Sequence, residues 1–195
     1  MRCRTHIVVA NALSLALVQP QNITELIVCT VTATIGGAIS DLDIRTSDSH
    51  KAVDIVVCMT LITILGAYLL DLKYNFGIFN QIINSKYYVN ILGIILVTSI
   101  CFFGMHQPHR SFLHSFLAIF LLTLILYICY DYIWVPFLIG MLSHVFLDIF
   151  NKRKVRLFYP LNRGISIKLC SYDSFIDTLI FLVGLIIIII ELFIM

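Results

Sequence analysis

Residues 132–150 have the sequence YIWVPFLIGMLSHVFLDIF, an apolar run of the length that crosses a membrane as a helix. Only His144 and Asp148 interrupt this run with groups that carry charge near neutral pH. Because they are four residues apart, they share one face of a helix, one turn from each other. An ionisable pair inside an apolar helix is costly, so the pattern predicts a membrane helix with a functional site on it. The alternative is a buried His–Asp hydrogen bond that joins two helices.

The composition of the whole chain agrees with a membrane protein. Of its 195 residues, 60% are hydrophobic and 12% are charged, whereas soluble domains carry about 25% charged residues. The mean hydropathy is +0.99. The net charge of +2 is too small to indicate a nucleic-acid partner. The six cysteines are scattered without metal-type spacing, and we assign them no function.

The apolar residues fall into seven segments: 7–18, 26–40, 53–70, 87–105, 112–130, 132–150 and 175–195. The third to seventh are long enough to span a bilayer, and the first two are short. Barrel strands would alternate polar and apolar residues, which these segments do not do. We therefore predict an all-α fold, a polytopic transmembrane helical bundle of about seven helices that forms a single domain over residues 1–195.

The placement of Lys and Arg predicts the orientation. If the N-terminus lies inside, seven crossings put eleven of these residues in inner segments and two, Lys73 and Lys86, in outer ones. This bias predicts a multi-pass protein of the bacterial cytoplasmic membrane with a cytoplasmic N-terminus. Its longest polar stretch, about residues 151–173, would be a basic cytoplasmic loop.

The same topology places seven candidate metal ligands at the inner membrane face. They are His6, Asp41, Asp43, His109, His114, His144 and Asp148. His109 and His114 are five apart, so only a break in the helix after Pro108 would let both point inward. The alternatives are interfacial histidines for this pair and a solvated loop for Asp41 and Asp43.

Four imidazoles and three carboxylates form a ligand set that suits a divalent metal. Zinc is the ion we expect first, with manganese, iron or nickel as alternatives. Seven ligands exceed one tetrahedral ion and predict a two-metal site. We expect His114, His144 and Asp148 to be the catalytic residues, and Arg110 to bind an anionic substrate.

Several motifs in this order resemble the YdjM-type family of membrane-bound metal-dependent hydrolases. They are His6, then Asp41-Leu42-Asp43 with Ser47, then residues 109–115 (HRSFLHS), residues 143–148 (SHVFLD), and residues 155–160. The family pattern is a His near the N-terminus, PDIDHPxS, HRGxTHS, SHLxLDxxT and a GVxLLYP-like stretch, and the resemblance covers roughly residues 1–165. It implies a multi-pass bacterial inner-membrane protein with a divalent-metal site, and it adds Ser115 to Arg110 as a substrate-binding candidate. One description of the family is LexA-binding.

The sequence departs from the family pattern at several positions. Ser40 stands in place of Pro, Ile44 and Arg45 in place of His-Pro, Leu113 in place of Thr, Asn151 in place of Thr and Lys154 in place of Gly. All seven candidate ligands are retained.

We therefore expect a metal-dependent hydrolase at the cytoplasmic membrane face, with the lipid bilayer as its surroundings and a lipid-linked or phosphoester substrate. One alternative is an ion or small-solute transporter, but transporters place polar groups near the midplane. The other is a non-catalytic regulatory or interaction protein of the membrane. The sequence indicates no oligomeric state.

Overall fold

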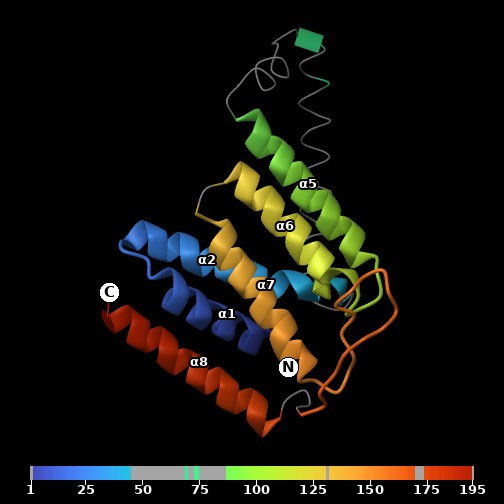
Figure 1. Ribbon diagram of the computed structural model, residues 1–195. Helices are drawn as coiled ribbons and strands as arrows, with labels where there is room; N and C mark the ends of the chain where they lie inside the picture. The colour runs from blue at the N-terminus through green and yellow to red at the C-terminus, as the bar shows by residue number, and fades with distance from the viewer. Residues whose placement is uncertain are drawn as a thin grey trace.

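The computed structural model describes residues 2–44, 69, 73–74, 87–130, 132–169 and 174–194 of the chain. Figure 1 shows the six α-helices of these ranges, which are α1 (Cys3–Val18), α2 (Ile23–Ile39), α5 (Tyr88–Met105), α6 (Phe116–Cys129), α7 (Trp134–Ile149) and α8 (Phe175–Ile194). Two short 3₁₀ helices adjoin them: η1 (Ser40–Asp43) follows α2, and η2 (Phe112–His114) precedes α6. The β pairing within the described ranges is one isolated antiparallel bridge, Val155 to Ile165. The predicted all-α fold class is confirmed.

Three described helices are long and apolar enough to cross a membrane: Ile23–Asp43 (α2 with η1), α5 and α8, of 21, 18 and 20 residues. The apolar helices α1, α6 and α7 are shorter, with 16, 14 and 16 residues. The expectation was therefore wrong for three segments, because the second is long and the fifth and sixth are short. The fifth apolar run is shortened because its first residues form η2 instead of the start of α6. The third segment lies outside the described residues, apart from Leu69, so the count of seven spans stays a prediction.

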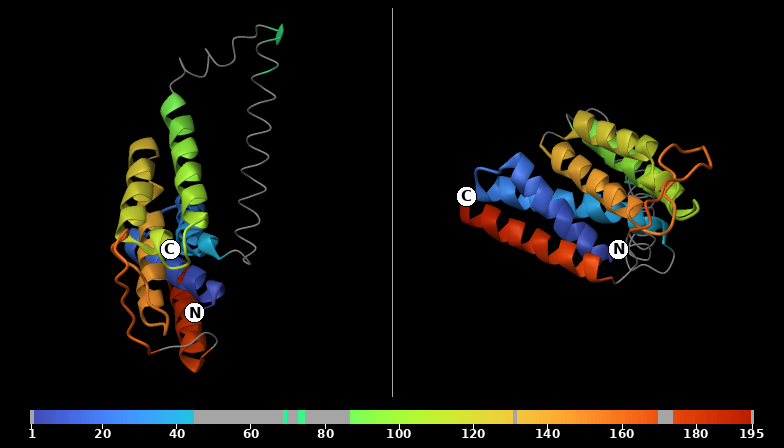
Figure 2. Two further views of the ribbon diagram at one scale, coloured as in Figure 1. Left: turned by 90° about the vertical axis from the view of Figure 1, so that its right-hand side faces the viewer. Right: turned by 60° about the horizontal axis from the view of Figure 1, so that its bottom comes forward.

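Helices α1, α2 and α7 pack against one another, and α6 and α5 follow on the other side of α7 (Figures 1 and 2). Glycines allow α2 and α7 to approach closely. A Cβ on Gly140 would lie 2.6 Å from the carbonyl oxygen of Ala33 and 2.8 Å from the nitrogen of Gly37. A Cβ on Gly36 would collide with the carbonyl of Phe137. Small residues at such crossings are typical of helices that pack in membranes.

Helix α8 lies beside α1 and runs parallel to it, as the lower part of Figure 1 shows. At their N-terminal ends, Nε of Arg2 lies 2.7 Å from a carboxylate oxygen of the fully buried Asp177. One to two turns further along, Gly184 packs against Val8. In the predicted topology of seven crossings, the first and the last helix would cross the membrane in the same direction, and the parallel arrangement of α1 and α8 is compatible with this.

Most buried apolar side chains lie where α5, α6, α7, η1 and η2 meet, and Leu113, Leu122 and Met141 at this place are fully buried. Large apolar side chains cover the outer faces of α5 and α8 and are exposed there. In a bilayer those faces would contact lipid. The candidate ligands lie at the end of this core formed by η1 and η2.

Candidate metal centre

The structure brings all seven candidate ligands to one place. They come from the first turn of α1, from η1, from the segment that ends in η2, and from the last two turns of α7. Three groups have ligand atoms within 4.8 Å of one another: His6 with His144 and Asp148; Asp41 with His114 and His144; and Asp43 with His109 and His114. His144 belongs to the first two groups and His114 to the last two. The groups therefore form one connected cluster.

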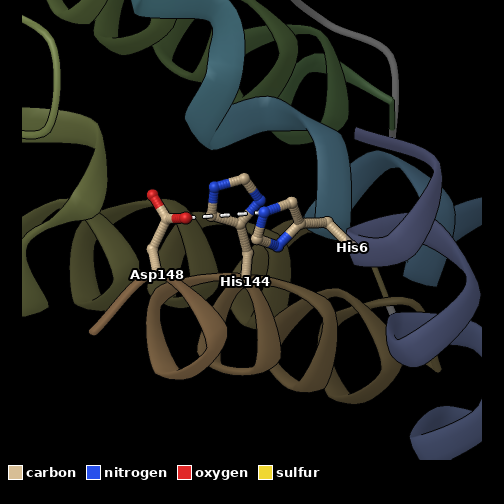
Figure 3. A group of neighbouring side chains, drawn as sticks. All are labelled: His6, His144 and Asp148. Atoms are coloured by element: carbon tan, nitrogen blue, oxygen red, sulfur yellow. Dashed lines mark ion pairs between the residues drawn. The ribbon is translucent and has the colours of Figure 1, made fainter. Parts of the chain in front are cut away.

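The first group, shown in Figure 3, joins α1 to α7. Nε2 of His6 lies 3.5 Å from Oδ1 of Asp148, and the rings of His6 and His144 stack with centroids 3.9 Å apart. All three residues are at most 2% exposed. His144 and Asp148 share one face of α7, as their spacing predicted.

His144 is held by the backbone of α2. Its Nδ1 lies 2.7 Å from the carbonyl oxygen of Gly37. Because a carbonyl can only accept, Nδ1 carries the hydrogen and donates it, and Nε2 of the neutral ring keeps its lone pair. That Nε2 lies 3.6 Å from Oδ1 of Asp41. A histidine that donates its other ring nitrogen in this way is oriented as a metal ligand is.

His114 occupies the middle of the cluster. Its Nδ1 lies 3.4 Å from Oδ2 of Asp43 and its Nε2 lies 3.4 Å from Oδ2 of Asp148. Asp43 also contacts His109, whose Nδ1 lies 2.6 Å from Oδ1. His114 is fully buried, whereas the side chain of His109 is 30% exposed. The cluster is therefore closed at His6 and open at His109.

The chain turns sharply between His109 and His114, and this break lets both rings reach Asp43. Arg110 has a φ of 62°, in the left-handed region that non-glycine residues rarely adopt. Its N–H donates to Oδ2 of Asp43 at 2.9 Å. His114 ends η2, before α6 begins at Phe116. Because η2 breaks the helical register, the ring points into the cluster.

Arg110 connects the cluster to the loop after α7. Its Nη2 lies 3.1 Å from Oδ2 of Asp148, and Nη1 donates to the carbonyl oxygen of Arg153 at 2.9 Å. Its own carbonyl accepts the N–H of Arg156 at 3.0 Å. The side chain is 11% exposed, so the guanidinium lies at the edge of the cluster and not in bulk solvent.

The residues fit a divalent cation. Four buried ring nitrogens make no hydrogen bond in the described structure: Nδ1 of His6, both nitrogens of His114 and Nε2 of His144. Buried polar atoms without partners are rare, and each requires a cause such as an absent ion. With neutral imidazoles, three carboxylates and the Arg110 guanidinium leave the cluster a net charge of −2. A bound divalent cation would compensate this buried negative charge.

Ser115, expected at the substrate, is the N-cap of α6. Its Oγ accepts the N–H of Ala118 at 3.3 Å and donates to the carbonyl oxygen of Phe112 at 2.6 Å. It is fully buried. Its role toward a substrate stays a prediction.

Sequence reasoning missed the residues that support the ligands. Nδ2 of Asn151 donates to Oδ1 of Asp148 at 2.7 Å, and the Oγ of Ser40 donates to the carbonyl of Leu113 at 3.2 Å. Leu113 packs tightly against Gly104. These three positions are places where the sequence departs from the family pattern, and at each the different residue makes a contact that holds η1, η2 or Asp148. A polar residue one turn after Asp148 was the only available signal for Asn151.

Comparison with known proteins identifies one family. The YdjM inner membrane protein family matches residues 1–194. No curated protein matches the chain significantly, and no solved structure does. The family match extends beyond residue 165, where the resemblance of the motifs ended, and includes α8.

Proposed function

The chain belongs to the YdjM inner membrane protein family, and from this premise and the geometry of the cluster we propose that it is a metal-dependent hydrolase. Its site would lie at the cytoplasmic membrane face. The observation that carries the proposal is the set of four buried imidazole nitrogens that make no hydrogen bond to any group described, three of which lie 3.4–3.6 Å from a carboxylate oxygen. Imidazoles that served only to join helices would have such bonds.

The ligand roles follow from the three groups. His6, His144 and Asp148 would hold one divalent ion at the closed end, and Asp43, His109 and His114 a second at the open end. Asp41 would complete the middle group with His114 and His144. Zinc is the ion that we expect first from imidazole and carboxylate ligands, and manganese, iron or nickel would also suit them.

Bound divalent ions would supply Lewis-acid chemistry, since they lower the pKa of water to about 7 and polarise a phosphoryl or carbonyl oxygen. The protein's own groups prepare for this. The Gly37 carbonyl fixes the tautomer of His144, and Asn151 fixes the carboxylate of Asp148. His114 and His144 would be catalytic because each is shared by two groups, and Asp148 because its carboxylate contacts both His6 and His114.

Arg110 is suited to bind an anionic substrate. It is a guanidinium at the open edge of the cluster, next to the exposed side of His109. Its Nε is buried and makes no hydrogen bond within the described part of the chain. A phosphoester, free or linked to a lipid, has the charge and the oxygen acceptors for this donor. A site at the ends of membrane helices would lie close to lipid headgroups, which favours a lipid-linked substrate.

Transport is supported less well. The ligands gather at one end of α1 and α7 instead of at the middle of broken helices. A non-catalytic role, in which the cluster only ties helices together, predicts a different outcome in experiment. In that case the wild type would hydrolyse none of the substrates, and removal of His114, His144 or Asp148 would only lower the stability of the protein.

The test combines three measurements on purified protein in detergent: metal content, thermal stability with and without a chelator, and hydrolysis of generic phosphoester and lipid substrates. The proposal expects hydrolysis that depends on added metal and that His114→Ala, His144→Ala and Asp148→Ala each abolish, while most of the protein stays folded. Metal binding without hydrolysis of any substrate, together with a loss of stability in the variants, would favour the structural role over the enzyme.

A further inference from the structure

The loop after α7 has an unusual composition. Residues 151–169, which we call the strap, contain six Lys or Arg residues and no Asp or Glu. Five of the cationic residues are exposed: Lys152, Arg153, Lys154, Arg163 and Lys168. The charged side chains that the strap exposes next to the metal centre are therefore all positive.

Large apolar side chains are exposed on the same strap. They are Phe158, Leu161, Ile165, Ile167 and Leu169, and each is 47–61% exposed. A loop in water would normally carry polar residues at such positions. Mixed basic and apolar exposure is the pattern of segments that lie in the interface of a membrane.

The strap is folded and has a fixed place. The bridge between Val155 and Ile165 closes it, and the N–H of Ile167 donates to the carbonyl of Ile149 at the end of α7. Two of its own side chains, those of Val155 and Leu157, are buried in the core. The N–H of Phe116 donates to the carbonyl of Leu157, which ties the strap to the start of α6. The exposed side chains thus project from an ordered support (the orange loop of Figure 1).

The apolar side of the strap continues an apolar helix face. The ring of Phe158 packs edge-on against that of Phe116, with centroids 5.6 Å apart. Phe116 is 44% exposed, and so are its neighbours Leu117 and Phe120 to similar or greater extents, as on a lipid-facing helix. The strap therefore meets the bilayer where α6 enters it.

We propose that the strap is an interfacial membrane anchor that binds the headgroups of anionic phospholipids. Its cationic side chains would contact the negative headgroups, and Phe158 and Leu161 would insert between the lipids beside Phe116. Basic residues next to membrane helices are attracted to anionic leaflets within a Debye length of the surface. The inference stands independently of the hydrolase proposal, because it needs neither the metal nor the ligands.

Anionic lipid is favoured over a soluble partner because the exposed apolar residues adjoin a lipid-facing helix, not a separate patch. The strap contacts the cluster through Arg110, which bonds to the backbone of Arg153 and of Arg156. A bound headgroup would therefore lie close to the open edge of the metal centre.

The experiment places one tryptophan in the strap. Trp134 is the only native tryptophan, so Trp134→Phe with Phe158→Trp gives a single probe, and Trp134→Phe with Leu161→Trp gives a second. The proteins are reconstituted in nanodiscs of phosphatidylcholine, with or without phosphatidylglycerol, that contain lipids brominated near the headgroup. Quenching by the bromines reports insertion, and quenching by aqueous iodide reports exposure to water.

We expect severalfold stronger bromine quenching of both probes in the anionic discs, with lower iodide quenching, and partial reversal at high salt. Combined Lys152→Gln, Lys154→Gln and Lys168→Gln should remove the dependence on lipid charge. Native Trp134, at the other end of α7, is the matched control and should not respond to lipid charge. Equal iodide access and no bromine quenching in both kinds of disc would overturn the proposal and point to a soluble partner.

Discussion

The imidazole rings of His6 and His144 stack with their centroids 3.9 Å apart. This contact joins the first turn of α1 to α7, which is far away in sequence. Both rings have a buried nitrogen without a hydrogen bond, and both adjoin Asp148 or Asp41. A cation bound by both rings would stabilise this arrangement, because His6 and His144 belong to one group of possible ligands.

The approach of α2 to α7 should control the metal centre through Gly140. In Gly140→Ala the new Cβ would displace α2, and with it the Gly37 carbonyl that holds His144. We expect a loss of about 1–3 kcal/mol of stability from overpacking and a reduced metal content. Gly184→Ala is the control, because its Cβ would crowd Val8 at 2.8 Å, between α8 and α1. It should lower the melting temperature without lowering metal content. An equal metal loss in both variants would contradict this role of Gly140.

Asn151 should contribute to metal affinity by orienting the carboxylate of Asp148, without being a ligand itself. In Asn151→Ala the Asp148 carboxylate loses the amide that orients it, and such losses reduce metal affinity about 10- to 100-fold. Competition with a fluorescent chelator would measure this change. Asn90→Ala removes a comparable amide bond, to the carbonyl of Cys129 between α5 and α6, and should leave the affinity unchanged. An unchanged affinity in Asn151→Ala would exclude the proposed support.

Two substitutions of Arg110 can distinguish the effect of its left-handed backbone conformation from the effect of its side-chain charge. Arg110→Ala and Arg110→Gly both remove the guanidinium from Asp148, but only alanine has a Cβ that disfavours the left-handed backbone, by roughly 1–2 kcal/mol. We therefore expect the glycine variant to be the more stable of the two in thermal unfolding. Both should lose binding of anionic substrate analogues to the same extent. A more stable alanine variant would show that the turn adopts another conformation in solution.

The predicted topology has a cytoplasmic N-terminus and a C-terminus on the opposite side. Reporter fusions after Asn151 should be active as cytoplasmic fusions, and fusions at Met195 as external ones. The reason is the excess of Lys and Arg in the inner segments. Both ends on the same side would exclude an odd number of crossings.

The positions of the helices and the choice of ligands could be predicted from the sequence. Most helix boundaries fall within a few residues of the apolar runs because burial in lipid requires continuous apolar stretches. The candidate ligands could be chosen because charged groups are scarce in such a chain. Their convergence followed from topology, since each lies at the same end of its segment.

The internal geometry of the cluster could not be predicted. The left-handed Arg110 and the short η2 helix depend on contacts with Asp43 and with the strap, which are distant in sequence. The close crossing of α2 and α7 is encoded by Gly36 and Gly140, but a glycine in an apolar run does not reveal its partner. Supporting residues such as Asn151 are unremarkable in sequence and gain their role only from tertiary contacts.

The metal content of the purified protein tests the central claim most directly. Elemental analysis by mass spectrometry should find close to stoichiometric divalent metal in the wild type and a large loss in His114→Ala and in His144→Ala. His106→Ala is the matched control, because His106 is exposed and, among the described residues, its ring contacts the carbonyl and the ring of Phe102 on its own helix and none of the candidate ligands. It should retain the wild-type metal content. A folded wild-type protein that binds no divalent metal, even after metal is added, would contradict the account.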